Sequence, residues 1–189
     1  LLTSAGGDHS VPQNVEPPEP VPLLIASPPR PGDIIINEIL FEPLGELQED
    51  GRAQSQYIEL YNRKPYALSL KGVHLRERQG AAGARIHPAE DEELWIPGEG
   101  FALLYPETGS GDFSRSRVAR FFDLPDPSDP PEPPGFTTIR FDRSTLGLAA
   151  SGRTLLLSDE YGQVLDRVDY RRDWHTPNRI STRGISLER

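Results

Sequence analysis

Residues 56–77 (QYIELYNRKPYALSLKGVHLRE) constrain the fold more than any other stretch, because they hold two strand-forming runs separated by a corner. The run from Tyr57 to Asn62 contains aromatic and branched side chains that suit a pleated, half-buried surface. Lys64-Pro65 interrupts a ladder, since proline has no N–H to donate. The pattern predicts one strand before the corner and a second strand entered through residues 68–72.

A first strand is expected at Asp33 to Leu40 (DIIINEIL), as an antiparallel neighbour of Tyr57 to Asn62. Strand side chains alternate between faces, and both faces of this run carry apolar residues with one polar interruption. That pattern is typical of a strand covered on both sides. Alternation assigns Ile34, Ile36, Glu38 and Leu40 to one face, and Ile35, Asn37 and Ile39 to the other.

Further strand signals follow at short intervals. Pro97-Gly98 separates two apolar runs and predicts a hairpin between the strands that end at Ile96 and span Phe101 to Tyr105. A second hairpin is expected at residues 155–170 around Asp159 to Gly162, and residues 184–189 supply a closing strand. With 17 Gly, 20 Pro and no long amphipathic helix, the chain is predicted to be an all-β sandwich of about 8–9 strands.

Two regions fall outside this pattern. Residues 1–32 hold eight of the 20 prolines and predict an extended arm or interdomain linker ahead of a domain at 33–189. Residues 106–143 form an irregular, proline-rich insertion that includes a strand-like FTTIRF, and loops of that length are usually functional. The candidate contacts to a partner are Leu23, Leu24 and Ile25 in the arm and Phe121 and Phe122 in the insertion.

Composition narrows the functional classes. The net charge of -9 disfavours nucleic acid as a partner, and no run is long and apolar enough to cross a bilayer. The chain has no cysteine, which rules out disulfides and thiolate metal sites. It also has no methionine, even at position 1, which indicates a piece of a longer chain.

Three carboxylates lie on strands among apolar or aromatic side chains: Glu38, Glu59 and Asp166. A carboxylate in such a place is paired, hydrogen-bonded or neutral, so these residues are weak candidates for a Ca²⁺ or Mg²⁺ site. The alternative for Glu38 and Asp166 is a structural role, in which each accepts hydrogen bonds from backbone amides, an arginine or a tyrosine. Glu59 is expected to be solvated or paired with an arginine.

No catalytic set emerges from the other reactive residue types. The four histidines (His9, His74, His87 and His175) have no ligand spacing, and His175 with Trp174 is expected to cap a sheet corner. Ser151 lacks a histidine partner and a nucleophile elbow, and residues 80–85 (GAAGAR) lack the lysine and helix of a phosphate loop. The basic cluster Arg167, Arg171, Arg172, Arg179 and Arg183 either binds an acidic partner or is a solvated surface balanced by Asp166, Asp169 and Asp173.

The ordered set of runs resembles the lamin tail domain family, in its bacterial branch. The residues that carry the resemblance are IINEI (35–39), YIELYN (57–62), LSLKGVHLRE (68–77), IPGEGFALL (96–104), LGLAASGRTLLLSDEYGQVLDRVDY (146–170), Trp174-His175 and GISLER (184–189). This resemblance implies an immunoglobulin-like sandwich without catalytic residues, found in secreted or cell-surface proteins. The insertion at 106–143 departs from the family pattern.

Three functions are therefore expected, in order of preference. The first is a non-catalytic protein-interaction or structural module of a larger exported or cell-surface bacterial protein, with no cofactor. The second is an accessory domain of a secreted nuclease or phosphoesterase that binds a divalent cation. The third is a subunit of a surface assembly whose N-terminal arm adds a strand to a neighbour's sheet edge.

Overall fold

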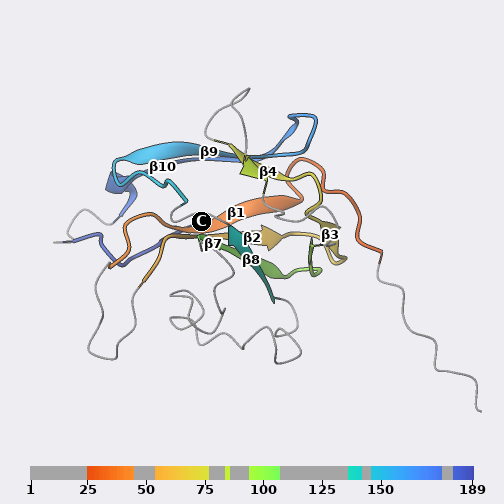
Figure 1. Cartoon of the computed structure of the whole chain (residues 1–189), viewed down its shortest axis with the longest axis horizontal. Helices are drawn as coiled ribbons and strands as arrows, with labels where there is room; N and C mark the ends of the chain where they lie inside the picture. Colours follow the sequence, from red (N-terminus) through yellow and green to blue (C-terminus); the bar gives the residue numbers. More distant parts are fainter. Residues whose placement is uncertain are drawn as a thin grey trace, which may run out of the picture.

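The computed structural model describes residues 25–44, 54–76, 84–85, 94–106, 136–141, 146–175 and 181–189. Within these ranges the chain forms eleven strands and one short 3-10 helix, and most of the strands belong to two sheets stacked face to face (Figure 1). The prediction of an all-β sandwich is therefore confirmed. The count exceeds the expected 8–9 strands because several of the elements are only two residues long.

The lower layer in Figure 1 is a five-stranded sheet. Its order is β11 (Leu187–Glu188), β1 (Ile34–Leu40), β2 (Tyr57–Asn62), β7 (Phe101–Pro106) and β8 (Phe136–Phe141). All neighbours are antiparallel except β7 and β8. The expected antiparallel pairing of β1 with β2 and the closing strand near the end of the chain are both confirmed.

The upper layer is a four-stranded sheet in the order β10 (Val164–Arg171), β9 (Gly152–Ser158), β4 (His74–Arg76) and β5 (Ala84–Arg85). β9 and β10 form the predicted hairpin, and Asp159 holds its turn by accepting the N–H groups of Tyr161 and Gln163. The second run of the central stretch is split, because a turn at Lys71-Gly72 separates β4 from β3 (Leu68–Ser69).

The main core lies between the two sheets. It contains fully buried side chains from β1 and β2, such as Ile34 and Leu60, against Leu157 and Tyr170 of the β9–β10 hairpin. A second, smaller cluster lies on the other face of the five-stranded sheet, and its members are Leu40, Tyr57, Leu103 and Tyr105. The five-stranded sheet is thus buried on both faces, as the two-sided pattern of β1 predicts.

The predicted faces of β1 are wrong beyond Ile36, because the strand contains a β-bulge. Ile36 is opposite Leu60 whereas Glu38 is opposite Glu59, so Asn37 is an extra residue in the ladder. One extra residue reverses the alternation that follows it. Ile39 consequently joins the main core, and Leu40 lies on the outer face with Glu38.

The hairpin predicted across Pro97-Gly98 is also wrong. The turn itself exists, since the N–H of Gly100 donates to the carbonyl of Pro97 at 3.1 Å. However, β6 (Trp95–Ile96) pairs with β3 in a separate two-stranded sheet. Both edges of β7 are occupied by β2 and β8, so β6 has no edge of β7 to pair with.

The long segment between β7 and β8 has a topological explanation. These strands run parallel, from Phe101 opposite Phe136 to Pro106 opposite Phe141. Parallel neighbours need a crossover of about a dozen residues or more, and residues 107–135 provide that length. The FTTIRF run is thus a strand, as expected.

Contacts with the sandwich begin before the expected domain start at Asp33. The N–H of Ser27 donates to the carbonyl of Ala67 at 3.1 Å, and the carbonyl of Ser27 accepts the N–H of Ser69 at 2.8 Å. These bonds make a parallel bridge beside β3. The last residues of the proline-rich region therefore belong to the folded unit.

Candidate functional site

The register of three strands places three glutamates in one row. Glu38 of β1 is directly opposite Glu188 of β11 on one side and Glu59 of β2 on the other. Directly opposed residues of antiparallel strands have their side chains on the same face. Two of the three predicted carboxylates, Glu38 and Glu59, are therefore brought together.

Glu38 is engaged by a tyrosine. The hydroxyl of Tyr57 donates to Oε1 of Glu38 at 2.6 Å, a short distance typical of a hydroxyl bonded to a carboxylate. Burial raises the pKa of the Tyr57 hydroxyl well above its usual range, and the hydrogen bond to Glu38 adds to the rise. The predicted hydrogen bond from a tyrosine to Glu38 is therefore present.

Within the described residues, Glu59 is paired with a side-chain amide and not with an arginine, which was one of the two arrangements expected for it. Its Oε1 accepts a hydrogen bond from the side-chain amide of Asn37, the bulge residue, at 2.8 Å. Burial raises the pKa of Glu59 above the usual value, and the charges of Glu38 and Glu188 add to the rise. The bulge that alters the faces of β1 thus also supplies the partner of Glu59.

Asp166 joins the two sheets. Its Oδ2 accepts the backbone N–H of Ile36 in β1 at 2.8 Å, and Nη1 of Arg189 lies 3.0 and 2.9 Å from its two oxygens. The Asp166 side chain is only 9% exposed, so little water reaches its bond to Ile36, whereas the Arg189 side chain is 51% exposed. The predicted donors to Asp166, a backbone amide and an arginine, are therefore both present.

The three carboxylates do not form one site. Asp166 belongs to the four-stranded sheet and bonds to the edge of β1, whereas Glu38 and Glu59 lie on the outer face of the five-stranded sheet. Across the residues that the structure describes, no three His, Cys, Asp or Glu side chains are placed to hold a metal ion.

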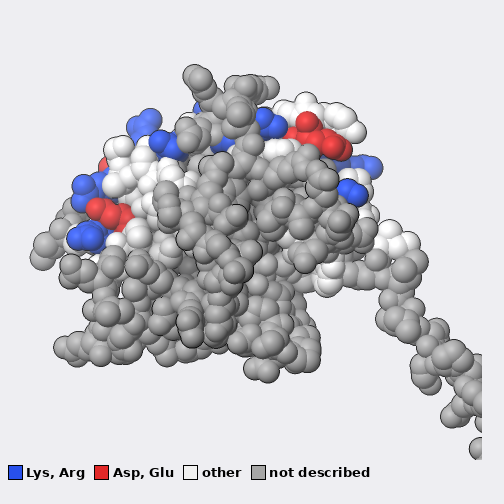
Figure 2. All heavy atoms as spheres, in the orientation of Figure 1, with Lys and Arg blue, Asp and Glu red and all other residues white. Residues whose placement is uncertain are grey.

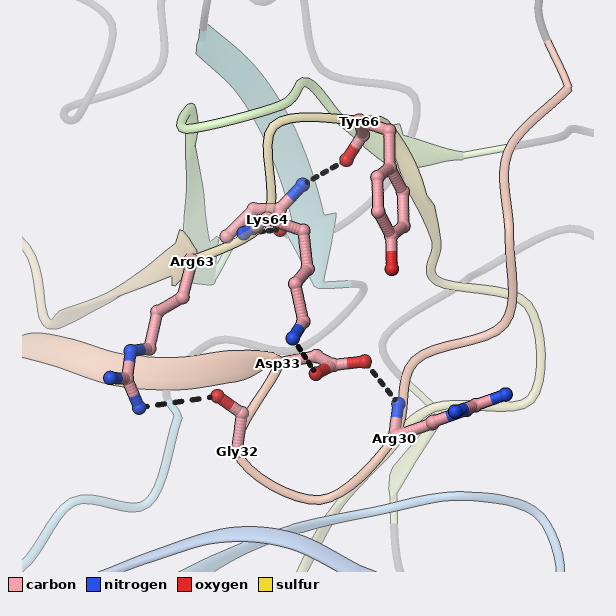
Figure 3. Close-up of polar contacts among 7 residues, drawn as sticks. Arg30, Gly32, Asp33, Arg63, Lys64 and Tyr66 are labelled. Atoms are coloured by element: carbon pink, nitrogen blue, oxygen red, sulfur yellow. Dashed lines mark hydrogen bonds and ion pairs between the residues drawn. The ribbon is translucent and has the colours of Figure 1, made fainter.

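A dense polar corner closes the end of the sandwich where β2 leaves its sheet (Figure 3). Asn62 is fully buried, and its Nδ2 donates to the carbonyls of Tyr66, Ile96 and Pro97 at 2.8, 3.2 and 2.8 Å. Beside it, the carboxylate of Asp33 accepts the N–H of Arg30 and pairs with Nζ of Lys64 at 3.0 Å. These groups hold the backbone of three separate segments together, so we interpret the corner as structural.

The open side of the sandwich contains a groove of about 310 Å³, between β10 and the β1–β11 pair. Its apolar lining includes Ile39, Val168, Tyr170 and Leu187. Trp174, in the 3-10 helix η2 (Arg172–Trp174) after β10, also lines it and is 56% exposed. Indole rings exposed beside apolar grooves are typical of protein-binding surfaces.

Sequence reasoning missed this edge groove, and it placed Trp174 at a sheet corner. A signal was present, because residues 167–171 alternate charged and apolar side chains and a tryptophan follows at once. Alternation of this kind marks a strand with one solvated face. The contribution of Leu187 from the opposite sheet has no local signal.

The basic cluster is a mixed surface. Nε of Arg167 lies 2.9 Å from the carboxylate of Asp169, while the guanidinium of Arg172 is hydrogen-bonded to Thr182 and lies 3.8 Å from the carboxylate of Glu42.

Among the other members of the basic cluster, the side chains of Arg171 and Arg183 are exposed, and Arg179 lies outside the described residues. Figure 2 shows basic and acidic groups interspersed over the described part of the visible face, with no continuous basic area. Asp169 balances Arg167 as expected, but Asp166 is paired with Arg189.

The remaining candidates are scattered. His74 is bonded through Nδ1 to the carbonyl of Gly72, and the His175 ring lies 5.6 Å from that of Phe41. Ser151 is exposed in the turn before β9. His9, His87 and residues 80–83 of the glycine-rich loop lie outside the described residues.

Of the predicted contact residues, only Ile25 is described. It is 75% exposed, so its side chain does not dock on the sandwich, and Ser27 makes the bridge instead. Leu23, Leu24, Phe121 and Phe122 lie outside the described residues. Their expected contacts stay predictions.

Comparison with known proteins leaves the family open, since neither a protein-family model nor a curated protein matches this chain. Within the described residues, no helix has the length and apolar character needed to span a membrane. The edge groove is therefore the feature on which a functional proposal can be built.

Proposed function

We propose that this chain is a non-catalytic protein-interaction module whose binding surface is the edge groove. The observation that carries the proposal is the exposure of Trp174 beside an apolar floor. A large aromatic side chain that continues an apolar floor forms a contiguous apolar surface, and a partner that covers this surface removes it from water with a gain in free energy. The groove also opens along β10, which among the described strands has a neighbour, β9, on one side only.

The non-catalytic part of the proposal is supported by how the candidate carboxylates are used. Glu38 accepts from Tyr57, Glu59 accepts from Asn37, and Asp166 accepts from Ile36 and Arg189. A general acid or base needs access to a substrate, whereas these groups bond strands to one another. Their arrangement supports a structural role.

The rival is an accessory domain of a secreted hydrolase that binds Ca²⁺ or Mg²⁺. A cation that prefers the folded state raises the melting temperature by mass action. We expect the melting temperature of the full chain to stay unchanged on titration with either cation to millimolar concentration. A rise that Glu59→Gln abolishes would favour the rival.

The family and the location are also part of the proposal. We infer a lamin-tail-like, immunoglobulin-like domain of an exported or cell-surface bacterial protein. In support, the motifs that carry the resemblance coincide with elements of the sandwich, since YIELYN is β2 and SGRTLLLSDEYGQVLDRVDY spans β9 and β10. A surface assembly through the arm is the remaining alternative.

Photocrosslinking tests the binding surface. The photoreactive amino acid p-benzoylphenylalanine replaces Trp174 in the chain in its native host, and Tyr161, 88% exposed in the β9–β10 turn, serves as the matched control position. We expect a discrete protein adduct from position 174 and none from position 161. Absence of an adduct from position 174, or equal adducts from both, would contradict the proposal.

A further inference from the structure

We propose that the edge groove binds an extended segment of a partner protein as an additional strand beside β10. The segment carries apolar side chains at alternate positions and, between them, charges in the order acidic, basic, acidic. This inference rests on the proposed function and specifies the kind of partner. Strand addition supplies backbone hydrogen bonds for affinity and alternate side-chain contacts for specificity.

The four-stranded sheet, the upper layer in Figure 1, is one strand short on the side of the groove. Its edge strand β10 is bonded to β1 below it, since the carboxylate of Asp166 accepts the N–H of Ile36. β11 lies beside β1, one strand further out. Among the described strands, none continues the upper sheet past β10 to cover β11. The groove of about 310 Å³ lies in that position, between β10 and β11.

The free edge of β10 offers backbone groups to such a strand. β10 pairs with β9 through alternate residues, so the N–H and C=O groups of the others point away from β9. At one end of this edge, the carbonyl of Leu165 accepts the N–H of Gly32 at 2.8 Å. At the other end, β10 stops at Arg171 and η2 follows. The edge between these points suits an added strand of about five residues.

The floor of the groove favours an extended segment with apolar residues at every second position. Val168, the half-buried Leu187 and the exposed Trp174 line the groove. Side chains of a strand alternate between its faces, so every second side chain of the added strand points toward this floor. A strand takes up about 4.8 Å of a sheet, whereas a helix with its side chains is about 10 Å across. A position one strand wide therefore excludes a helix.

The outer side chains of β10 set the order of charges in the partner. Arg167, Asp169 and Arg171 are exposed and alternate in sign along the strand. Arg167 and Asp169 lie 2.9 Å apart, but their side chains are 61% and 48% exposed, and an exposed ion pair contributes little. Opposite charges directly across two strands attract and like charges repel. The edge therefore accepts an acidic, basic, acidic segment and opposes strands with other charge patterns.

The order of charges, and not the net charge, is what the groove distinguishes. Its lining holds both signs, because Glu188 and Arg189 lie on the side of β11 and Arg189 pairs with Asp166. The whole chain carries a net charge of -9, which attracts any basic peptide at long range. Local complementarity at β10 and the long-range field therefore favour opposite ligands, and a pair of peptides can separate the two effects.

Two synthetic peptides test the inference by fluorescence anisotropy with the full chain. The matching peptide is Thr-Glu-Val-Lys-Val-Glu-Thr, and the reversed control is Thr-Lys-Val-Glu-Val-Lys-Thr. We expect the matching peptide to bind with a Kd on the order of tenfold lower, because its charges are opposite in sign to those of β10 at each position. Equal binding, or tighter binding of the reversed peptide, would overturn the inference.

Reversing the charges of the edge should invert this preference. The combined variant Arg167→Asp, Asp169→Arg and Arg171→Asp keeps opposite charges at positions 167 and 169, so the pair within β10 is retained. It should bind the reversed peptide more tightly than the matching one. Lys71→Asp, at an exposed turn position away from β10, is the control and should leave the preference unchanged. An unaltered preference in the combined variant would contradict pairing along β10.

The contribution of the floor is measured with Trp174→Ala, which should raise the Kd of the matching peptide on the order of tenfold. Tyr161→Ala, an exposed aromatic position in the β9–β10 turn, should have no effect. Circular dichroism checks that both variants fold. Equal effects of the two substitutions would contradict binding over the groove.

N-methylation of the matching peptide tests the backbone bonds. Alternate N–H groups of a strand point to opposite edges, so methylating one alternate set should abolish binding and methylating the other should not. Binding that survives both would overturn strand addition. If neither peptide binds but position 174 still gives a discrete photoadduct, the proposed function stands without this inference; loss of both results would contradict the proposed function as well.

Discussion

The carboxylate of Asp166 in β10 accepts the N–H of Ile36 in β1 at 2.8 Å and thereby bonds one sheet of the sandwich to the other. The same carboxylate pairs with Arg189 beside it. One short side chain thus fixes the spacing of the two sheets at the side where the groove opens.

Replacing Asp166 with Ala should lower the free energy of unfolding by about 1–3 kcal/mol, because it leaves a backbone donor without its acceptor in a site that water barely reaches. Arg189→Ala, which removes an exposed partner, should cost less than about 1 kcal/mol. Urea denaturation of both variants measures the difference. Equal losses would show that the ion pair, and not the bond to Ile36, carries the effect.

Gly98→Ala should be strongly destabilising, because an added Cβ would lie 2.4 Å from the backbone carbonyl group of Pro65. Overpacking against backbone costs about 1–3 kcal/mol or more, since backbone cannot rotate away as a side chain does. Gly32→Ala is the control: its Cβ meets open space, but its φ of +81° strains an alanine by about 1 kcal/mol. Thermal melts should show the larger loss for Gly98→Ala, and the reverse order would contradict the packing explanation.

Asn62→Asp should destabilise the fold more than Asn62→Ala at pH 7. Nδ2 of Asn62 donates to three carbonyls, and a buried carboxylate would face those oxygens with a negative charge and no donor. Because protonation removes the charge, Asn62→Asp should recover part of its stability as the pH falls. Denaturant curves at pH 7 and pH 5 check this, and an aspartate variant as stable as the alanine variant at pH 7 would refute it.

Ionisation of the Glu59 carboxyl should lower the free energy of unfolding as the pH rises. Burial raises the pKa of Glu59 in the folded state above its usual value of 4.5, so its favourable contribution is complete below pH 4.5 and is lost as pH increases through the raised value. Glu59→Gln keeps an oxygen for Asn37 and removes the charge. The variant should therefore melt at a higher temperature than the wild type at pH 7.

The advantage of Glu59→Gln should shrink toward pH 4. Other titrating groups, such as the exposed Asp169 whose pKa Arg167 holds low, occur in both proteins and cancel in the difference. Paired melts from pH 4 to 8 give the comparison. A constant difference across that range would rule out titration of Glu59 as its cause.

Local sequence patterns were sufficient to predict the strands β2, β9 and β10. The alternation in YIELYN and in the residues of β9 and β10 predicts strands, and the Asp159-to-Gly162 turn predicts the pairing of β9 with β10. The hydrogen bonds that Glu38 and Asp166 accept were also predictable, because an acid among apolar side chains needs a donor. Each of these inferences depends on residues close together in the chain or on a requirement of one residue.

Pairings between distant segments were not predictable in the same way. The bulge at Asn37 changes the faces of β1, and nothing local distinguishes that residue from a regular strand position. Likewise, β6 leaves the expected hairpin because β2 and β8 already occupy both edges of β7. Competition for a strand edge is decided by the whole sheet.

The sequence alone determined that this chain folds as an all-β sandwich, because the period of its apolar residues and the positions of its turns are local properties. The tertiary structure decided which carboxylates meet, which donor each one finds, and that Trp174, Val168 and Leu187 line one groove. The physical reason is that these contacts join residues from different strands and from both sheets, whose distances are set only when the sheets pack.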